Sequence, residues 1–417
     1  MNFFLTFLFC ALCFLPKPAD AQETLESQVS ELKQLVQQLQ QTVERQQNEI
    51  NSLKVASSQP QPIDTKPVNQ IRDLVGGSAA RWMPEIGVVA DAVLMLDSPK
   101  ADAEGADRLS MRELELVLGS AVDPYSRLDA TISFSDFEVA SLEEAYYTHF
   151  ELPWDFTGRI GKLKPRIGKA IPMHRDSLDT VDEPLVIQKY FGTEGYNRSG
   201  ADVTKILDLP WPSAHQLSFG VLEGGVGEGG TAFGSTRRRP TIYSHLKNFW
   251  NVSDAQTFEL GASHLIGSKD ADAHFEVNVL GLDATWVRHL NSAQTFKLQG
   301  ECLYMNREET FTFDEGTLRD LNNLDGTPWG AYLLGDFRIS TRWATGMRLD
   351  YAELVDNPVL NPHKADIGYT GYLTLHQSEF ARWRLQLTHV DLATGKDDNR
   401  VMLQGTFAIG EHKHKIT

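Results

Sequence analysis

The chain has 417 residues and a formal net charge of −17; hydrophobic residues make up 41% of it and charged residues 23%. This balance suits a folded protein and is too polar for a bundle of membrane-spanning helices. The acidic excess also argues against general nucleic-acid binding, which needs a basic face. After the N-terminal segment, no stretch approaches the roughly 18–20 consecutive apolar residues that a membrane helix requires.

Residues 1–21 have the pattern of a secretory signal peptide. An apolar core precedes Ala19-Asp20-Ala21, which offers a small-x-small cleavage site. Cleavage there removes Cys10 and Cys13, so the mature chain retains Cys302 alone. We therefore predict an exported chain with neither an intramolecular disulfide framework nor a cysteine-based zinc site.

The next segment, 22–54, has the heptad repeat of a coiled coil. The seam residues are Leu25, Val29, Leu32, Val36, Leu39, Val43, Gln46, Ile50 and Leu53, of which one is polar. This repeat predicts a helix that associates with other helices, because a lone amphipathic helix would leave so narrow a stripe unburied. Its β-branched and leucine positions favour two strands, whereas a barrel behind it would impose three, and the sequence leaves the number open.

Residues 55–80 have the composition of a linker, since Pro60, Pro62 and Pro67 stand among serine, glutamine and threonine. From 81 to 410 the hydrophobic period becomes two. Within 343–351, for example, the bulky residues at odd positions alternate with Ala, Gly, Arg and Asp. We find about 16 such runs of about ten residues, the dyad pattern of membrane-spanning β-strands. The last residues, 411–417, form a polar tail.

Connections between these runs alternate between short and long. Those at 123–125 and 291–294 are short, whereas 166–199 and 306–328 are long and polar. Tryptophans recur near the ends of the runs. A soluble β-sandwich would also alternate, but it rarely needs so many strands or such recurring end aromatics. We therefore predict an all-β fold, a transmembrane antiparallel β-barrel of about 16 strands preceded by the short α-helical coiled coil.

Positive charge is densest directly before the longest irregular segment of the chain. The basic residues here are Arg159, Lys162, Lys164, Arg166, Lys169 and Arg175, and the acidic residues that follow are Asp176, Asp179, Asp182 and Glu183. A connection of about 30 residues without regular structure is usually functional. We expect it to fold into the lumen, where the basic residues form an anion-facing constriction and the acidic residues its counter-wall. A salt-bridged loop on the surface is the alternative.

Strand alternation also assigns charged residues to the wall of the lumen. These are Lys297, Arg348, Arg382 and Arg384. A register slip of one residue would invert each assignment, and mutually paired wall residues with no role in selection are the simpler interpretation.

Two further motifs lack what their chemistry needs. His412-x-His414 offers two imidazoles without a third ligand, so we predict no metal site there. The glycine-rich stretch 224–230 lacks the Lys-Ser/Thr and the helix that a phosphate-binding loop requires. No serine or acidic pair stands in a pattern with a histidine that recommends catalysis. We expect no cofactor, no metal and no enzymatic activity.

The stretch Gly161-Lys-Leu-Lys-Pro-Arg-Ile-Gly168 resembles the G-x-F-K-P-x-F-G strand signature of phosphate-selective porin O/P-like outer-membrane porins. Leu163 and Ile167 replace the aromatic residues of that signature. Tyr243–Asp254, followed by Phe258–Ser263, is similar to a hairpin of the wider group. The resemblance implies a barrel of 16 strands, usually trimeric, with one loop folded into the channel.

These patterns predict a passive outer-membrane porin of a Gram-negative-type bacterium, a water-filled channel for small hydrophilic solutes whose basic constriction favours anions, phosphate included. The expected partners are outer-membrane lipid, the solutes and further copies of the chain, with a trimer favoured. The coiled coil would lie in the periplasm and contact the cell wall. The alternative function is a structural envelope protein that tethers the outer membrane to the cell wall through the coiled coil.

Overall fold

The computed structural model describes residues 84–97, 108–135, 140–209, 213–234, 237–270, 275–309, 324–355 and 363–410. The expected signal peptide, coiled coil and linker lie outside these residues, as does the polar tail.

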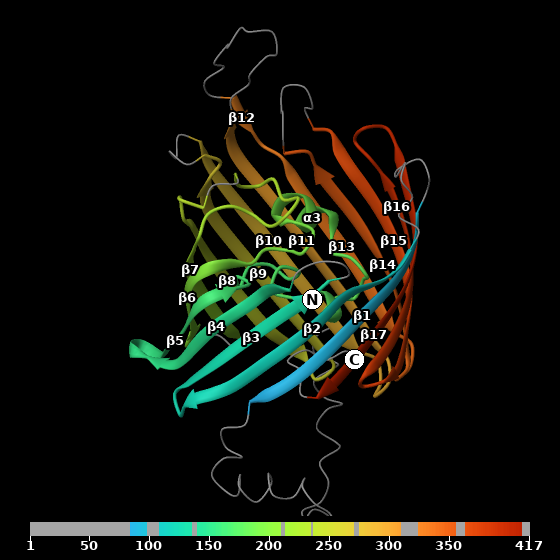
Figure 1. The fold of residues 1–417 in the computed structure, drawn as a ribbon, viewed down its shortest axis with the longest axis horizontal. Coiled ribbons are helices and arrows are strands. Elements are labelled where there is room, and N and C mark those ends of the chain that lie inside the picture. The colour runs from blue at the N-terminus through green and yellow to red at the C-terminus, as the bar shows by residue number, and fades with distance from the viewer. Residues whose placement is uncertain are drawn as a thin grey trace, which may run out of the picture. The chain divides into compact units, whose positions relative to one another are not determined.

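The described part of the chain is built from antiparallel strands that pair in chain order (Figure 1). They are β1 (Glu85–Asp97), β2 (Arg108–Asp123), β3 (Ser126–Phe134), β4 (Ser141–Leu152), β5 (Phe156–Leu163), β6 (Arg198–Leu207), β7 (Ala214–Leu222), β8 (Thr241–Ser253), β9 (Gln256–Ser268), β10 (Glu276–His289), β11 (Thr295–Glu309), β12 (Leu324–Gly326), β13 (Trp329–Arg338), β14 (Trp343–Glu353), β15 (Ala365–Ser378), β16 (Ala381–Asp391) and β17 (Asp397–Gly410).

The sheet closes on itself. β17 pairs with β1 from Gly87 opposite Gly410 to Asp97 opposite Arg400. β12 and β13 both pair with β11 and share one position in the barrel. The result is the closed 16-stranded antiparallel barrel that the dyad pattern predicts, and closure leaves no strand edge without a partner among the described residues.

Alternation along the strands separates an apolar outer face from a polar inner face. On β14, Met347 is 66% exposed, whereas the neighbouring Arg348 is only 2% exposed and Asp350 is buried with it. The same contrast recurs on β16, where Leu385 is exposed between buried Arg384 and Gln386. Apolar side chains outside and polar side chains inside are the arrangement that a barrel in lipid needs.

The connections also divide as expected. Short turns such as β2–β3 and β8–β9 lie at one end, and longer connections such as β7–β8 lie at the other (Figure 1). One 3-10 turn, η2 (Pro153–Asp155), joins β4 to β5. Among the described residues, no helix is long and apolar enough to cross a membrane.

Residues 164–197, which we name the lumen loop, connect β5 to β6 and lie inside the barrel. They contain the 3-10 turn η3 (Arg175–Ser177) and the helix α3 (Leu185–Phe191), so the segment is less irregular than the sequence suggested. α3 packs against β13 and β14 (Figure 1). The loop also bonds to inward residues of β2, β4, β11 and β16, which surround the lumen.

Candidate functional site

The lumen loop begins where Pro165 ends the β5 ladder, because proline has no N–H to donate. Gly168 then adopts a positive φ of 61°, and a Cβ there would collide with the carboxylate of Glu301 on β11. That carboxylate accepts a hydrogen bond of 3.1 Å from the backbone N–H of Lys169. The proline and the glycine of the Lys164-Pro-Arg-Ile-Gly168 motif thus turn the chain away from the wall and into the lumen.

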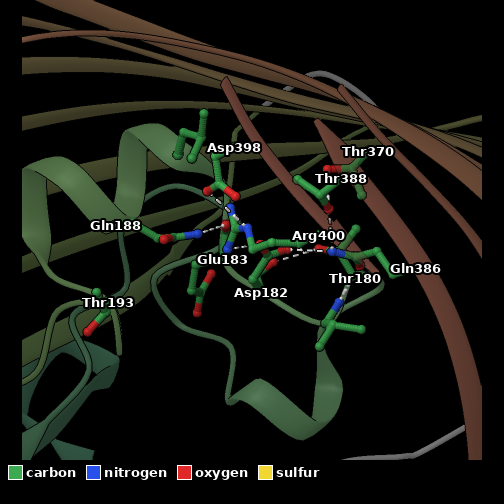
Figure 2. A network of polar contacts seen from close by, with 12 residues as sticks. Thr180, Asp182, Glu183, Gln188, Thr193, Thr370, Gln386, Thr388, Asp398 and Arg400 are labelled. Atoms are coloured by element: carbon green, nitrogen blue, oxygen red, sulfur yellow. Dashed lines mark hydrogen bonds and ion pairs between the residues drawn. The ribbon is translucent and has the colours of Figure 1, made fainter. Parts of the chain in front are cut away.

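The first half of the lumen loop is held by polar contacts, with Asp182 at their centre. Its Oδ1 accepts a hydrogen bond of 2.9 Å from Gln386 Nε2 on β16, and its carboxylate lies 3.3 Å from an Arg348 nitrogen and 3.7 Å from an Arg400 nitrogen. Figure 2 shows Asp182 beside Gln386 and Arg400. Burial raises the pKa of Asp182, but the charges of Arg348 and Arg400 outweigh burial and lower it below its usual range.

Arg348 is the wall residue that binds this half most extensively. Its Nε donates a hydrogen bond of 2.7 Å to Asp350 on the same strand, and its Nη1 donates one of 2.7 Å to the carbonyl of Asp182. Nη1 also bonds to Thr180, and Nη2 donates to the carbonyl of Glu183 at 3.2 Å. A fully buried guanidinium with all these partners fixes the chain between 180 and 183 to β14.

Three further wall cations contact the same half. Arg382 on β16 donates a hydrogen bond of 2.5 Å to the carbonyl of Asp176, and Lys297 on β11 lies 2.5 Å from the carboxylate of Asp179. From β2, Arg112 donates 2.5 Å to the carbonyl of Val181 and pairs with Asp91 on β1. Asp176, Asp179 and Asp182 therefore contact the arginines and the lysine of the wall.

His174 lies among carboxylates at the start of this half. Its Nε2 is 2.8 Å from Glu144, and its Nδ1 is 3.2 Å from Glu143 and 3.6 Å from Glu115. Burial and the charge of Lys164 lower the pKa of His174, but the hydrogen bonds to the three carboxylates outweigh both and raise it well above its usual range. Carboxylates of strands β2 and β4 thus favour the charged form of the imidazole.

The second half of the lumen loop is held by apolar packing. α3 buries its apolar residues completely or nearly so, and the ring of Phe191 packs against that of Tyr196 with centroids 5.1 Å apart and planes inclined by 39°. The wall contributes apolar side chains at the same level, among them Tyr332 on β13 and Ala352 on β14. One charge pair, Lys189 with Asp366 on β15, lies at the margin of this core.

Glu183 stands at the junction of the two halves. Its side chain is fully buried, and neither carboxylate oxygen has a hydrogen-bond partner among the described residues. Burial raises the pKa of Glu183 to about 7, against the lowering effect of Lys164, Arg175 and Arg348. This carboxyl therefore changes its charge near neutral pH.

Of the six predicted constriction residues, three are neutralised by neighbouring carboxylates. Arg159 on β5 is buried and binds both oxygens of Asp202 on β6. Lys169 pairs with Glu259 and lies 3.2 Å from Asp283. The third, Arg175, lies 3.4 Å from Glu194.

The side chains of the other three form no ion pair with a carboxylate among the described residues, although the backbone N–H of Lys164 donates a hydrogen bond of 2.8 Å to Glu144. Lys164 donates a hydrogen bond of 2.7 Å to the carbonyl of Met173, and Arg166 bonds to Thr204 on β6. Lys162 lies on the same side of β5 as Ile160, which is 61% exposed, and therefore points away from the lumen. The structure does not bring Lys162 together with the other five.

All four residues predicted for the lumen wall lie on the inner face. Arg348, Arg382 and Arg384 are buried there, and Lys297 is half-buried. Arg384 donates hydrogen bonds of 3.1 Å to Thr374 and 3.2 Å to Gln404, and it forms no ion pair with a described residue.

Sequence reasoning missed the partners that position these charges. Asp202 binds Arg159 and also accepts a hydrogen bond of 2.7 Å from the hydroxyl of Tyr243 on β8. Glu143 and Glu144 were not singled out, although adjacent glutamates in an alternating strand are a signal, because one of them must break the alternation. A bulge in the β3–β4 pairing lets both adjacent glutamates be buried.

Comparisons with known proteins agree with this architecture. No family model matches the chain. An uncharacterized protein of Aquifex aeolicus (strain VF5) is 28% identical over 326 residues, which are 72% of this chain and 68% of that protein.

Among solved structures, the outer membrane channel DcaP of Acinetobacter baumannii is similar with a TM-score of 0.51 and 10% identity, over 78% of this chain and 96% of that one. An anion-selective porin from Comamonas acidovorans has a TM-score of 0.51 and 10% identity, over 78% and 99%. OprB of Pseudomonas putida has a TM-score of 0.52 and 9% identity, over 80% and 97%. These likenesses show an outer-membrane porin fold. The narrower O/P-like group stays a prediction.

Proposed function

We propose that the chain is a passive porin in the outer membrane of a Gram-negative-type bacterium, where it conducts small hydrophilic solutes. The observation that carries this proposal is the closed barrel with an apolar outer face, a polar inner face and a loop bonded inside the lumen. Such a barrel lowers the barrier that a polar solute meets in hydrocarbon, and the lumen loop limits the width of the passage. No catalytic step, cofactor or resident metal is needed for conduction.

We further propose that the passage favours anions, with phosphate as one candidate. Support comes from the cations that lack a carboxylate partner among the described residues. Arg384 on β16 is bound only by neutral groups and by the ring of Tyr372, 5.6 Å from its guanidinium. Arg166 is bound by Thr204. Because neutral partners leave the positive charge in place, these residues attract anions more than the paired Arg159 does.

Reversal potentials in a salt gradient test this preference. Arg384→Gln and Arg166→Gln are each expected to reduce the anion preference of the channel, because each removes a positive charge that forms no ion pair with a described carboxylate. Lys162→Gln is the matched control, since it removes a cation on the outward side of β5 and is expected to leave the reversal potential unchanged. An unaltered anion preference in the Arg384→Gln, Arg166→Gln double variant would contradict the proposal.

We also propose that copies of the chain associate in the membrane, with a trimer favoured, and that the coiled coil over 22–54 holds them together in the periplasm and contacts the cell wall. The heptad repeat supports this, since its seam needs a partner helix. Deleting 23–54 and sizing the detergent-extracted protein tests the association. An oligomer of unchanged size would remove the role of the coiled coil.

The rival function, an envelope tether with a closed barrel, has one observation in its favour. α3 and its apolar partners fill part of the lumen, and many inward side chains are buried. Single-channel conductance in planar bilayers separates the two functions. Stable conductance supports the porin, and its complete absence would leave the tether.

A further inference from the structure

Three side chains from separate elements converge where the lumen loop meets the wall. They are Glu115 on β2, Glu143 on β4 and His174 of the lumen loop, and each offers one ligand atom within 4.8 Å of the others. All three are buried, with exposed fractions of 2%, 8% and 2%. We propose that they bind one divalent transition-metal ion, which ties the lumen loop to β2 and β4.

The histidine is oriented for this role. Glu144 lies 2.8 Å from Nε2, so this ring nitrogen is occupied by a hydrogen bond to Glu144. Nδ1 is directed at the carboxylates of Glu143 and Glu115, at 3.2 Å and 3.6 Å. A carboxylate behind one ring nitrogen, with the other nitrogen directed at the metal, is the usual arrangement around a metal-bound histidine.

A second observation concerns Glu115. Its Oε2 is buried and makes no hydrogen bond to any described residue. A buried carboxylate oxygen without a partner is uncommon and calls for an ion, a proton or a water. This oxygen belongs to the side chain that, with Glu143 and His174, brings its ligand atom to the cluster.

The surrounding charges also leave room for a cation. Glu113 and Glu144 join Glu115 and Glu143, and the cations that act on the cluster are Lys164 and Arg175. These four carboxylates and two cations leave two negative charges. One divalent ion matches this formal excess of negative charge, and its ligands bind it in their deprotonated forms.

The donor set indicates which ion fits. One imidazole nitrogen suits zinc and its neighbours in the first transition row, whereas an all-oxygen site would suit calcium or magnesium. One histidine and two glutamates leave a fourth position of a tetrahedral zinc site for water. A bound ion would also stabilise the contacts of the lumen loop with β2 and β4, because pulling these elements apart would release the metal.

The test is the metal content of the full chain in detergent after equilibrium dialysis against micromolar zinc, measured by plasma mass spectrometry. All forms carry His412→Gln and His414→Gln, which removes the tail histidines as a background site. We expect one zinc per chain. Glu115→Gln and His174→Gln are each expected to weaken zinc binding by at least about tenfold, and His389→Gln, at a histidine paired with Asp391 on β16, to leave it unchanged.

A second measurement needs no variant in the cluster. The wild-type cluster loaded with cobalt is expected to show the d–d absorption of a low-coordinate site with nitrogen and oxygen ligands.

Retention of zinc at full stoichiometry in the folded Glu115→Gln, His174→Gln double variant would overturn the proposal. A folded chain with the wild-type cluster that binds neither zinc nor cobalt at micromolar concentrations would overturn the proposal as well.

Discussion

The two halves of the lumen loop lie in the same barrel and are held by opposite kinds of contact. The half from His174 to Glu183 is bound by arginines, lysines and carboxylates of β2, β4, β11, β14 and β16, whereas the half from Leu185 to Tyr196 is bound by apolar packing. The loop is therefore anchored twice. Charge pairs fix the position of the polar half against the wall. Burial of apolar surface supplies most of the free energy that holds the other half there.

Breaking the charged anchor at Arg348 is expected to cost the most stability. Arg348→Ala removes the cation that pairs with the buried carboxylates of Asp350 and Asp182 and leaves Asp182 only the more distant Arg400. We expect it to lower the free energy of unfolding by about 3–5 kcal/mol. Urea titrations of the barrel refolded in lipid vesicles measure this. Arg288→Ala, at an exposed site on β10, is the control and should change stability by less than about 0.5 kcal/mol. Equal losses in the two variants would contradict the charged anchor.

The apolar anchor is tested at Ile187, which is fully buried on α3. Ile187→Ala leaves a cavity in the core between α3 and the wall, and we expect a loss of about 3 kcal/mol in the same titration. Val252→Ala, at an exposed position near the β8–β9 turn, is the matched control. If Ile187→Ala were as mild as the control, α3 would not be packed against the wall.

The junction between the halves is expected to respond to pH. The pKa of Glu183 in the folded chain, about 7, exceeds its unfolded value, so between these two values the folded chain keeps a proton that the unfolded chain has lost. Stability contributed by this group is therefore complete below the unfolded pKa and falls as pH rises toward 7, by up to about 3 kcal/mol. Wild-type and Glu183→Gln chains are compared at pH 5 and pH 8. We expect a smaller decline in Glu183→Gln, and identical declines would refute the assignment.

The mildest loss is expected at Lys297, whose pair with Asp179 is partly exposed to the lumen. Lys297→Gln should cost about 0.5 kcal/mol, and this cost should shrink at high salt, because screening weakens exposed pairs. The measurement is the same urea titration at low and high salt. A loss as large as that of Arg348→Ala would show that the pair is not screened by lumen water.

The barrel could be predicted from the sequence because the alternation that produces it is a local pattern of neighbouring residues. Alternation at Met347, Arg348, Leu349 and Asp350 reports directly which face each residue meets. The place of the lumen loop was also accessible, since Pro165 ends the ladder before the longest described connection.

The helix and the contacts of the lumen loop could not be predicted from the sequence in the same way. α3 is too short to show a helical period, and it is buried on nearly all sides, so its helix depends on the wall that covers it. The cluster of Glu115, Glu143 and His174 joins elements that only the closed barrel brings together. Lys162 was assigned to the constriction because positive charge is dense around it. The density of charge along the sequence does not show on which face of a strand a residue lies.

The role of the lumen loop in an open channel is tested by single-channel conductance of the wild-type chain and of a variant in which a short glycine–serine turn replaces 166–196. If the lumen loop narrows an open channel, the wild-type chain conducts ions and the shortened chain conducts more per channel. Equal conductance in the two folded barrels would contradict a loop that limits the passage, and no conductance in either would contradict the channel itself.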